Sequence, residues 1–204
     1  MSKQQLNMFS EPEDVKARVI RKYNEEYSDF KPEMTIISLG AGLQSTVLYY
    51  MASMGIIQAD CAIFADTGAE DKHTYDNLDY MFKWCDNNNG IPIYIVSDKN
   101  IETDMNSNEF IEGRRFASIP VFAKGGNAQL PRQCTREYKV VEVQKKIRSL
   151  YGLKKNQRNK KTQVLLGITV DEMQRMNHSP DKWIKNGFPF LDMRMTRNDC
   201  KVWL

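Results

Sequence analysis

Thr35-Ile36-Ile37-Ser38-Leu39-Gly40-Ala41-Gly42-Leu43-Gln44-Ser45-Thr46 is the stretch that decides the fold, because an apolar run passes through two glycines into a helical pattern. Residues 35–38 predict a buried strand and residues 44–54 a helix. Glycines let a backbone approach phosphate oxygens, and the free N–H groups of a helix start point at them with a favourable dipole. The hydroxyls of Ser45 and Thr46 add donors. The stretch therefore predicts an anion site or, as the plainer alternative, a tight strand-to-helix turn.

Short apolar runs and helical stretches alternate beyond this loop. Strands are predicted at residues 61–65, 93–96 and 164–168, and helices at 71–86 and 136–151. Such alternation is typical of an α/β fold, a parallel twisted sheet with helices on both faces, in a Rossmann-like three-layer sandwich. Ligands of such sheets bind beyond the carboxyl ends of the strands. The glycine loop follows the first strand and lies at that edge.

The chain of 204 residues, 41% hydrophobic and 27% charged, is long enough for one well-buried core. We expect residues 1–33 to be an N-terminal extension with one amphipathic helix, whose apolar positions include Val15, Val19 and Tyr23. Residues 34–204 then form the nucleotide-binding domain. Residues 100–130 show little periodicity and predict a long surface excursion.

Charge and cysteine usage limit the classes of partner. A net charge of +3, from 29 basic and 26 acidic residues, excludes a polycation and names no partner. No apolar stretch approaches the roughly 20 residues that span a bilayer, so we expect a cytoplasmic protein without membrane contact. The four cysteines lie far apart, which disfavours disulfides, and a zinc site would need an unusual combination of ligands.

Residues 40–45 share features with two well-known phosphate-binding glycine loops. The Walker-type loop requires Gly-Lys-Ser/Thr, whereas this chain has Leu43-Gln44-Ser45, so that interpretation fails. The dinucleotide pattern Gly-x-Gly-x-x-Gly is nearly met, and Asp66, at the end of the next strand, could accept a hydrogen bond from a ribose hydroxyl. A dinucleotide-binding oxidoreductase therefore remains an alternative.

The same loop and three later segments resemble the PP-loop ATP pyrophosphatases, an adenine nucleotide alpha hydrolase-like superfamily. The resemblance is specifically to the branch similar to phosphoadenosine phosphosulfate reductase and the DNA phosphorothioation sulfurtransferases. Residues 40–45 resemble the family's Ser-Gly-Gly-x-x-Ser loop, and residues 64–70 its Asp-Thr-Gly segment. Residues 132–139 resemble its Cys-Thr-x-x-x-Lys element, and residues 167–176 its Gly-Ile-x-x-Asp-Glu-x-x-Arg segment. The resemblance runs from about residue 34 to the C-terminus.

The resemblance implies an adenylating ATP pyrophosphatase or a sulfur-transfer enzyme acting on a nucleotide or nucleic-acid-related substrate. ATP or another adenine nucleotide would bind with Mg²⁺. The implied nucleotide-binding residues are Ser38, Gly40, Ala41, Gly42, Gln44, Ser45, Thr46, Asp66, Thr67, Gly68 and Gly167. Arg136, Lys139, Arg175 and Cys134 would be catalytic, and Asp171 and Glu172 would lie near the magnesium ion.

The charges at residues 132–139 also indicate a function independently of the resemblance. Arg132, Arg136 and Lys139 would share one side of a helix start, where three cations are electrostatically awkward unless an anion is present. Phosphate binding is favoured over a solvated surface, since arginine grips phosphate bidentately. Neighbouring positive charge would favour a reactive thiolate at Cys134, although an isolated cysteine is often a small buried residue.

Three departures from the family pattern limit the prediction. Gln44 stands where the loop usually has an acid, the loop has no lysine, and the C-terminal cysteine pair is missing. Sulfonucleotide reduction and an iron–sulfur cluster in this chain alone are therefore not expected. A non-catalytic nucleotide-binding, sensing or sequestering protein stays open, as does a homo-oligomer or a subunit of a larger enzyme. Thr196 and Asp199 predict the cap of a final helix, while Arg194 and Arg197 could face the cleft or solvent.

Overall fold

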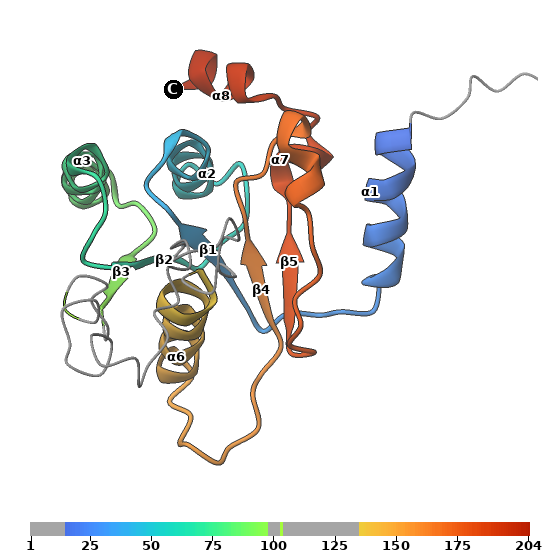
Figure 1. Ribbon diagram of the computed structural model, residues 1–204, viewed down its shortest axis with the longest axis horizontal. Helices are drawn as coiled ribbons and strands as arrows, with labels where there is room; N and C mark the ends of the chain where they lie inside the picture. Colours follow the sequence, from blue (N-terminus) through green and yellow to red (C-terminus); the bar gives the residue numbers. More distant parts are fainter. Residues whose placement is uncertain (1–14, 98–102, 104–134) are drawn as a thin grey trace, which may run out of the picture.

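The computed structural model describes residues 15–97, 103 and 135–204. Its centre is one parallel sheet in the order β3-β2-β1-β4-β5 (Figure 1). The strands are β1 (Met34–Leu39), β2 (Cys61–Ala65), β3 (Ile93–Val96), β4 (Thr162–Leu165) and β5 (Ile184–Gly187). This arrangement confirms the predicted parallel α/β fold.

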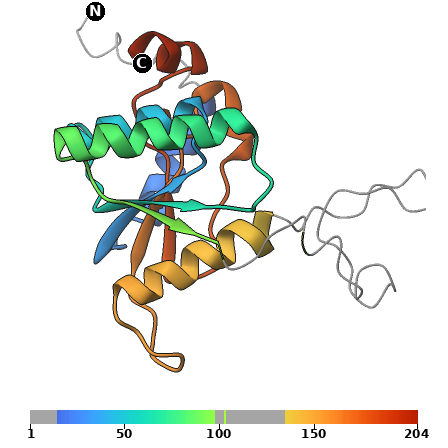
Figure 2. The same cartoon turned by 90° about the vertical axis from the view of Figure 1, so that its left-hand side faces the viewer.

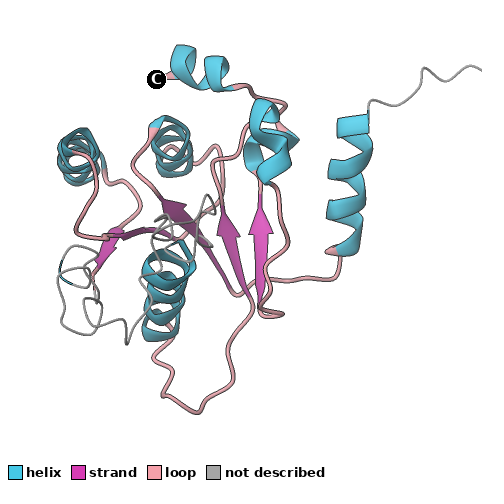
Figure 3. Cartoon of the chain, viewed as in Figure 1, coloured by secondary structure: helices cyan, strands magenta, loops and turns pink. Residues whose placement is uncertain are grey.

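Helices cover both faces of the sheet, as Figure 2 shows. Over one face lie α2 (Leu43–Ser53) and α3 (Lys72–Asn88), and over the other lies α6 (Val141–Leu150) (Figure 3). The remaining helical segments are α1 (Val15–Glu26), the π-helix η1 (Thr135–Val140), the 3-10 helix η2 (Val170–Arg175), α7 (Pro189–Asp192) and α8 (Arg197–Trp203).

The two sides of the sheet bury separate apolar cores, because successive side chains of a strand point to opposite faces. In β1, Ile37 and Leu39 pack in the core beneath α2 and α3, whereas Ile36 packs in the core beneath α6. In β2, Phe64 takes the first side and Ile63 the second. All five residues of β2 are buried, which is why this strand is apolar without interruption.

The first helix is anchored at the β5 edge of the sheet. Tyr23 of α1 is buried with Phe188 and Leu191, and its hydroxyl donates to the carbonyl of Asn186 at 2.7 Å. Burial raises the pKa of the Tyr23 phenol, which keeps it a neutral donor. The division of the chain at residue 33 stays a prediction. Within the described residues, no helix has the length and apolar character needed to cross a membrane.

Three elements differ from the sequence prediction, two in their boundaries and one in not having been predicted. The fourth strand is shifted toward the N-terminus, to 162–165, and Leu166 makes the last hydrogen bond to β5, from its N–H to the Gly187 carbonyl at 2.9 Å. The predicted helix 136–151 begins with the π-helical turn η1. The strand β5 was not predicted, because Ile184-Lys185-Asn186-Gly187 contains a single apolar residue and is a strand through its pairing with β4.

Candidate phosphate-binding site

The glycine loop lies where the sheet order reverses. The strand β1 pairs with β2 on one side and with β4 on the other, and the loop 40–42 follows its carboxyl end. The chains that follow β1 and β4 diverge at this point, which leaves a crevice outside the sheet. The predicted loop therefore occupies the usual ligand position of an open parallel sheet.

The loop presents an uncapped helix start to solvent. Gly42 is the N-cap residue of α2 and is exposed, and because glycine has no side chain it makes no capping hydrogen bond there. A Cβ at Gly42 would meet no described atom within 4 Å, so there is open space above it. The first N–H groups of a helix lack intrahelical acceptors and attract anions. Ala41 between the two glycines has a φ of 50° and is buried.

The helix α3 holds the loop from the side. The Asn77 amide donates to the Ala41 carbonyl at 2.8 Å and to the Thr46 hydroxyl at 2.9 Å. On the other side of the turn, the Ser45 hydroxyl donates to the Gly42 carbonyl at 3.0 Å. The bonds to the Ala41 and Gly42 carbonyls fix the shape of the loop and leave its backbone N–H groups to a ligand.

The segment after β2 forms a turn around one carboxylate. Oδ1 of Asp66 accepts from the backbone N–H of Gly68 and from the hydroxyl of Tyr75, both at 2.8 Å. Gly68 has a φ of 72°, a left-handed conformation that favours glycine. Burial and the bond to Asp66 raise the pKa of the Tyr75 phenol. The Asp66 carboxylate thus has a structural role in the turn, beside any role toward a nucleoside.

Lys139 is paired with an acid of the same turn. Its ammonium lies 2.7 Å from Oε1 of Glu70, which also accepts from the hydroxyl of Thr67 at 2.9 Å. The lysine side chain is 42% exposed and the glutamate 18%. Lys139, which the sequence suggests as a phosphate ligand, is therefore paired with a carboxylate of the segment that follows β2.

The segment after β4 packs directly on the start of α2. A Cβ at Gly167 would lie 3.0 Å from both the carbonyl carbon of Gln44 and the backbone nitrogen of Ser45. These neighbours are backbone atoms, so only glycine allows so close an approach. Gly167 therefore packs against the start of α2, directly after the glycine loop. This close packing is possible because glycine has no side chain.

Four side chains form one polar network beside the loop. Gln44 donates from Nε2 to Oε2 of Glu172 at 2.9 Å, and its Oε1 accepts from Nη1 of Arg197 at 2.9 Å. Arg175 donates to the same Glu172 oxygen at 3.1 Å. The structure thus brings together Gln44, Glu172 and Arg175, and it turns Arg197 toward the loop.

Asp171, a residue of η2, contacts the start of the last helix, α8. Its Oδ1 accepts from the backbone N–H of Arg197 at 3.0 Å, next to the capping box of Thr196 and Asp199. The neighbouring Thr169 side chain and this N–H hold the pKa of the Asp171 carboxyl below its usual range. The predicted cap at Thr196 is confirmed, and a magnesium site at Asp171 and Glu172 stays a prediction.

Part of the predicted site lies outside the described residues. This holds for Arg132, for Cys134 and for residues 104–130, and the side chain of Arg136 is likewise not described. Conversely, Asn77 holds the loop but was not predicted from the sequence. Its signal was a polar residue one helical turn before Met81, which is fully buried.

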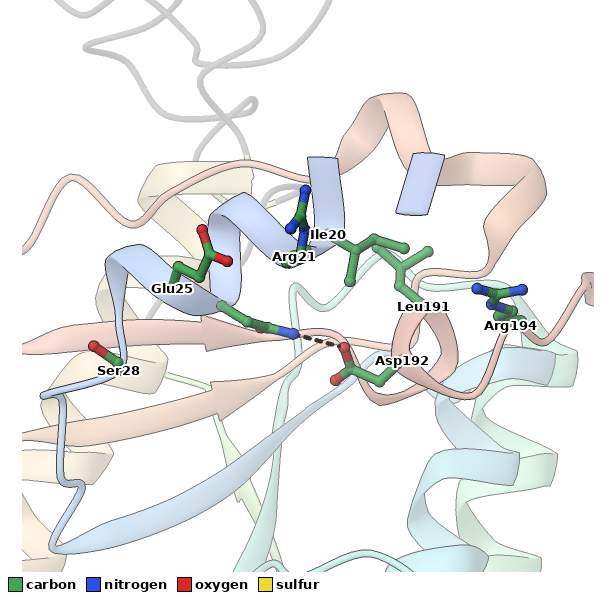
Figure 4. A pocket seen from close by; sticks show the side chains of 8 residues that line it. Ile20, Arg21, Glu25, Ser28, Leu191, Asp192 and Arg194 are labelled. Carbon is green, nitrogen blue, oxygen red and sulfur yellow. Dashed lines mark hydrogen bonds between the residues drawn. The ribbon is translucent and has the colours of Figure 1, made fainter. Parts of the chain in front are cut away.

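A separate hollow of about 520 Å³ lies between α1 and α7. Figure 4 shows Arg21 and Glu25 on one wall and Leu191 and Arg194 on the other. Arg194 therefore lines this hollow, whose lining residues include none of the phosphate loop.

No family model matches the chain, and no curated protein does. Among solved structures, the chain is similar to the U34-tRNA thiolase NcsA from Methanococcus maripaludis with its [4Fe-4S] cluster, at 14% identity and a TM-score of 0.44. The match covers 91% of this chain and 62% of that one. The fold assignment rests on the strand order and layers of the chain itself.

The cofactor prediction requires a correction. An iron–sulfur cluster was not expected in this chain alone, but the similar solved structure contains one. Cluster thiolates can come from distant parts of a chain, so a missing C-terminal pair does not exclude a cluster. Among the described residues, Cys61, Cys85 and Cys200 are free thiols, and no group of three or more His, Cys, Asp or Glu could hold a metal. Burial raises the pKa of the Cys61 thiol to about 11.

Proposed function

We propose that the chain binds ATP or another adenine nucleotide with its phosphates over residues 40–46 and uses it to adenylate a substrate. The observation that carries this proposal is the exposed, uncapped start of α2 with open space at Gly42. Two cations, Arg175 and Arg197, belong to the network beside it. Backbone donors at a helix start, with guanidinium groups in the network next to it, favour a polyphosphate.

The three family-like segments within the described residues support the same ligand. Residues 40–45, 66–70 and 167–175 follow β1, β2 and β4 at the carboxyl edge of the sheet. Segments far apart in the chain thus approach one crevice, as an ATP site that contacts both adenosine and phosphates requires. In this arrangement the segment after β2 would face the nucleoside and the segment after β4 the phosphates.

The proposed reaction is an in-line displacement at the α-phosphorus. A substrate oxygen forms a bond to that phosphorus, the bond to the β-phosphate oxygen breaks, and pyrophosphate leaves with the electron pair. A second nucleophile then displaces AMP, and a sulfur nucleophile would make the overall reaction a sulfur transfer. Loop N–H groups, Arg136, Lys139 and Arg175 stabilise the charge on the phosphates. A nucleotide or nucleic acid is the proposed substrate class, and Cys134 is the candidate nucleophile of the chain.

The ion pairs of Lys139 and Arg175 are compatible with binding of phosphates by these two cations. Lys139 and Arg175 are 42% and 64% exposed and each holds one carboxylate. Exposed pairs contribute about 0–1 kcal/mol, so a triphosphate can compete for both cations at little cost.

Calorimetry with ATP tests the proposal, and pyrophosphate release with candidate substrates tests turnover. Gly42→Ala should weaken ATP binding about tenfold, because the new methyl group occupies the open space of the phosphates. Gly152→Ala, at a left-handed turn directly after the C-terminal end of α6, is the control for a general loss of stability. Wild-type protein that ignores ATP, or that releases orthophosphate in place of pyrophosphate, contradicts the proposal.

One other function has an observation of its own. The order β3-β2-β1-β4-β5 and the acid Asp66 after β2 are also those of dinucleotide-binding domains. An oxidoreductase would bind NAD more tightly than ATP in the same calorimetric experiment. A non-catalytic binding protein, favoured by Gln44 in the loop, would bind ATP tightly and release no product.

A further inference from the structure

The amide of Gln44 connects three segments that are far apart in the chain. Gln44 is the second residue of α2, Glu172 lies in η2, and Arg197 is the first residue of α8. The Gln44 residue is 9% exposed, and each end of its amide has a charged partner at 2.9 Å. A nearly buried amide with both ends bonded to charges is a fixed part of the site.

The chemistry of position 44 follows from its two partners. Arg197 can only donate and the Glu172 carboxylate can only accept, so the side chain between them must accept at one end and donate at the other. Glutamine does both. A glutamate at position 44 would keep the bond from Arg197 but would place a second carboxylate against Glu172, where like charges repel.

The network also sets where positive charge lies. Glu172 is held between Gln44 and Arg175, and Arg197 is held by Gln44 and by its backbone bond to Asp171. Both guanidinium groups are therefore kept beside the first turn of α2, to which Gln44 belongs. The two arginines are balanced by the carboxylates of Glu172 and Asp171, so the attraction for an anion comes from the N–H groups of the helix start and from the two guanidinium groups, and not from a net charge.

We propose that Gln44 is a positioning residue for the nucleotide phosphates: its amide holds Glu172 and Arg197 in place, and the donor-acceptor polarity of the amide is what the site requires. This inference rests on the proposed nucleotide-binding function and deepens it. The amide at position 44 is then a specific feature of this site, and replacing it with an acid of the same size disrupts phosphate binding.

The test exchanges the two groups. Gln44→Glu should weaken ATP binding about tenfold through repulsion at Glu172, while adenosine, which has no phosphate, binds within about twofold of wild type. In the double variant Gln44→Glu with Glu172→Gln, the new amide donates through Nε2 to the new carboxylate, which still accepts from Arg197, and the amide oxygen Oε1 is the acceptor that Arg175 then uses. Binding of ATP should return to within about threefold of wild type. Gln58→Glu, the same change at an exposed site, is the matched control.

The outcomes separate this inference from the proposed function. An ATP affinity of Gln44→Glu equal to wild type overturns the inference, as does a double variant no better than Gln44→Glu. Equal losses of ATP and adenosine binding also overturn it, since they indicate general distortion. If wild type binds no ATP, the proposed function fails, and melting temperatures without nucleotide still test the network: the double variant must melt above Gln44→Glu.

Discussion

Gly167→Ala tests how closely the segment after β4 packs on the phosphate loop. The added Cβ would lie 3.0 Å from two backbone atoms, the Gln44 carbonyl carbon and the Ser45 nitrogen, and 3.2 Å from the Gln44 carbonyl oxygen. Ordinary contacts are longer by about half an ångström, and backbone cannot swing aside as a flexible side chain can. Overpacking of this kind costs about 1–3 kcal/mol. The stiffer unfolded chain offsets about 0.4–1 kcal/mol of that cost.

The net loss of about 1–2 kcal/mol should lower the melting temperature by about 2–8 °C in a chain of this size. Thermal unfolding followed by circular dichroism measures it. Gly40→Ala is the matched control, since a Cβ there would meet Ser45 Oγ at an ordinary 3.8 Å. If Gly167→Ala melts within 1 °C of Gly40→Ala, then the two segments are not in close contact, and the geometry of the site is wrong.

Two further predictions concern the surroundings of the loop. Asn77→Ala removes the bonds to the Ala41 carbonyl and the Thr46 hydroxyl, and should destabilise by about 1–3 kcal/mol in urea unfolding. The exposed Asn88→Ala in the same helix should cost less, and equal losses would contradict the bracing role. Because the folded-state pKa of the Asp171 carboxyl is lowered, its contribution is present above the usual carboxyl pKa and lost as pH falls through the folded value. The stability gap between wild type and Asp171→Asn should therefore shrink as pH falls below about 4, and a gap independent of pH would refute the assignment.

The fold could be predicted from local patterns because each early strand carries its own signal. The strands β1, β2 and β3 are apolar runs next to glycines or turns, and they were placed within one or two residues. The strand β5 had no such signal, since Lys185 and Asn186 occupy its middle. Its extended shape comes from pairing in which Lys185 lies opposite Gln163 of β4. A pairing partner more than twenty residues away leaves no mark on the local sequence.

The candidate site was predictable in part for a similar reason. The glycine loop and the acids after β4 carry motifs, so their positions were found. The direction of Arg197 was not predictable, because α8 is seven residues long and its orientation depends on the capping bond to Asp171. The role of Asn77 was hidden in the same way, since a polar residue in a helix shows its partner only after the helices pack.

The structure divides the site into a rigid part and an adjustable part. The loop backbone is fixed by Asn77 on one side and by the close approach of Gly167 on the other. The cations Lys139 and Arg175 are instead held by single carboxylates on partly exposed side chains. Backbone donors that need no rearrangement give the larger share of charge stabilisation, because their orientation is set during folding. In the proposed reaction, side-chain cations in weak pairs would follow the phosphates as the electron pair of the broken P–O bond passes to the leaving pyrophosphate. The proposed adenylation needs both parts of the site, because the loop would hold the triphosphate still while the leaving group gains charge.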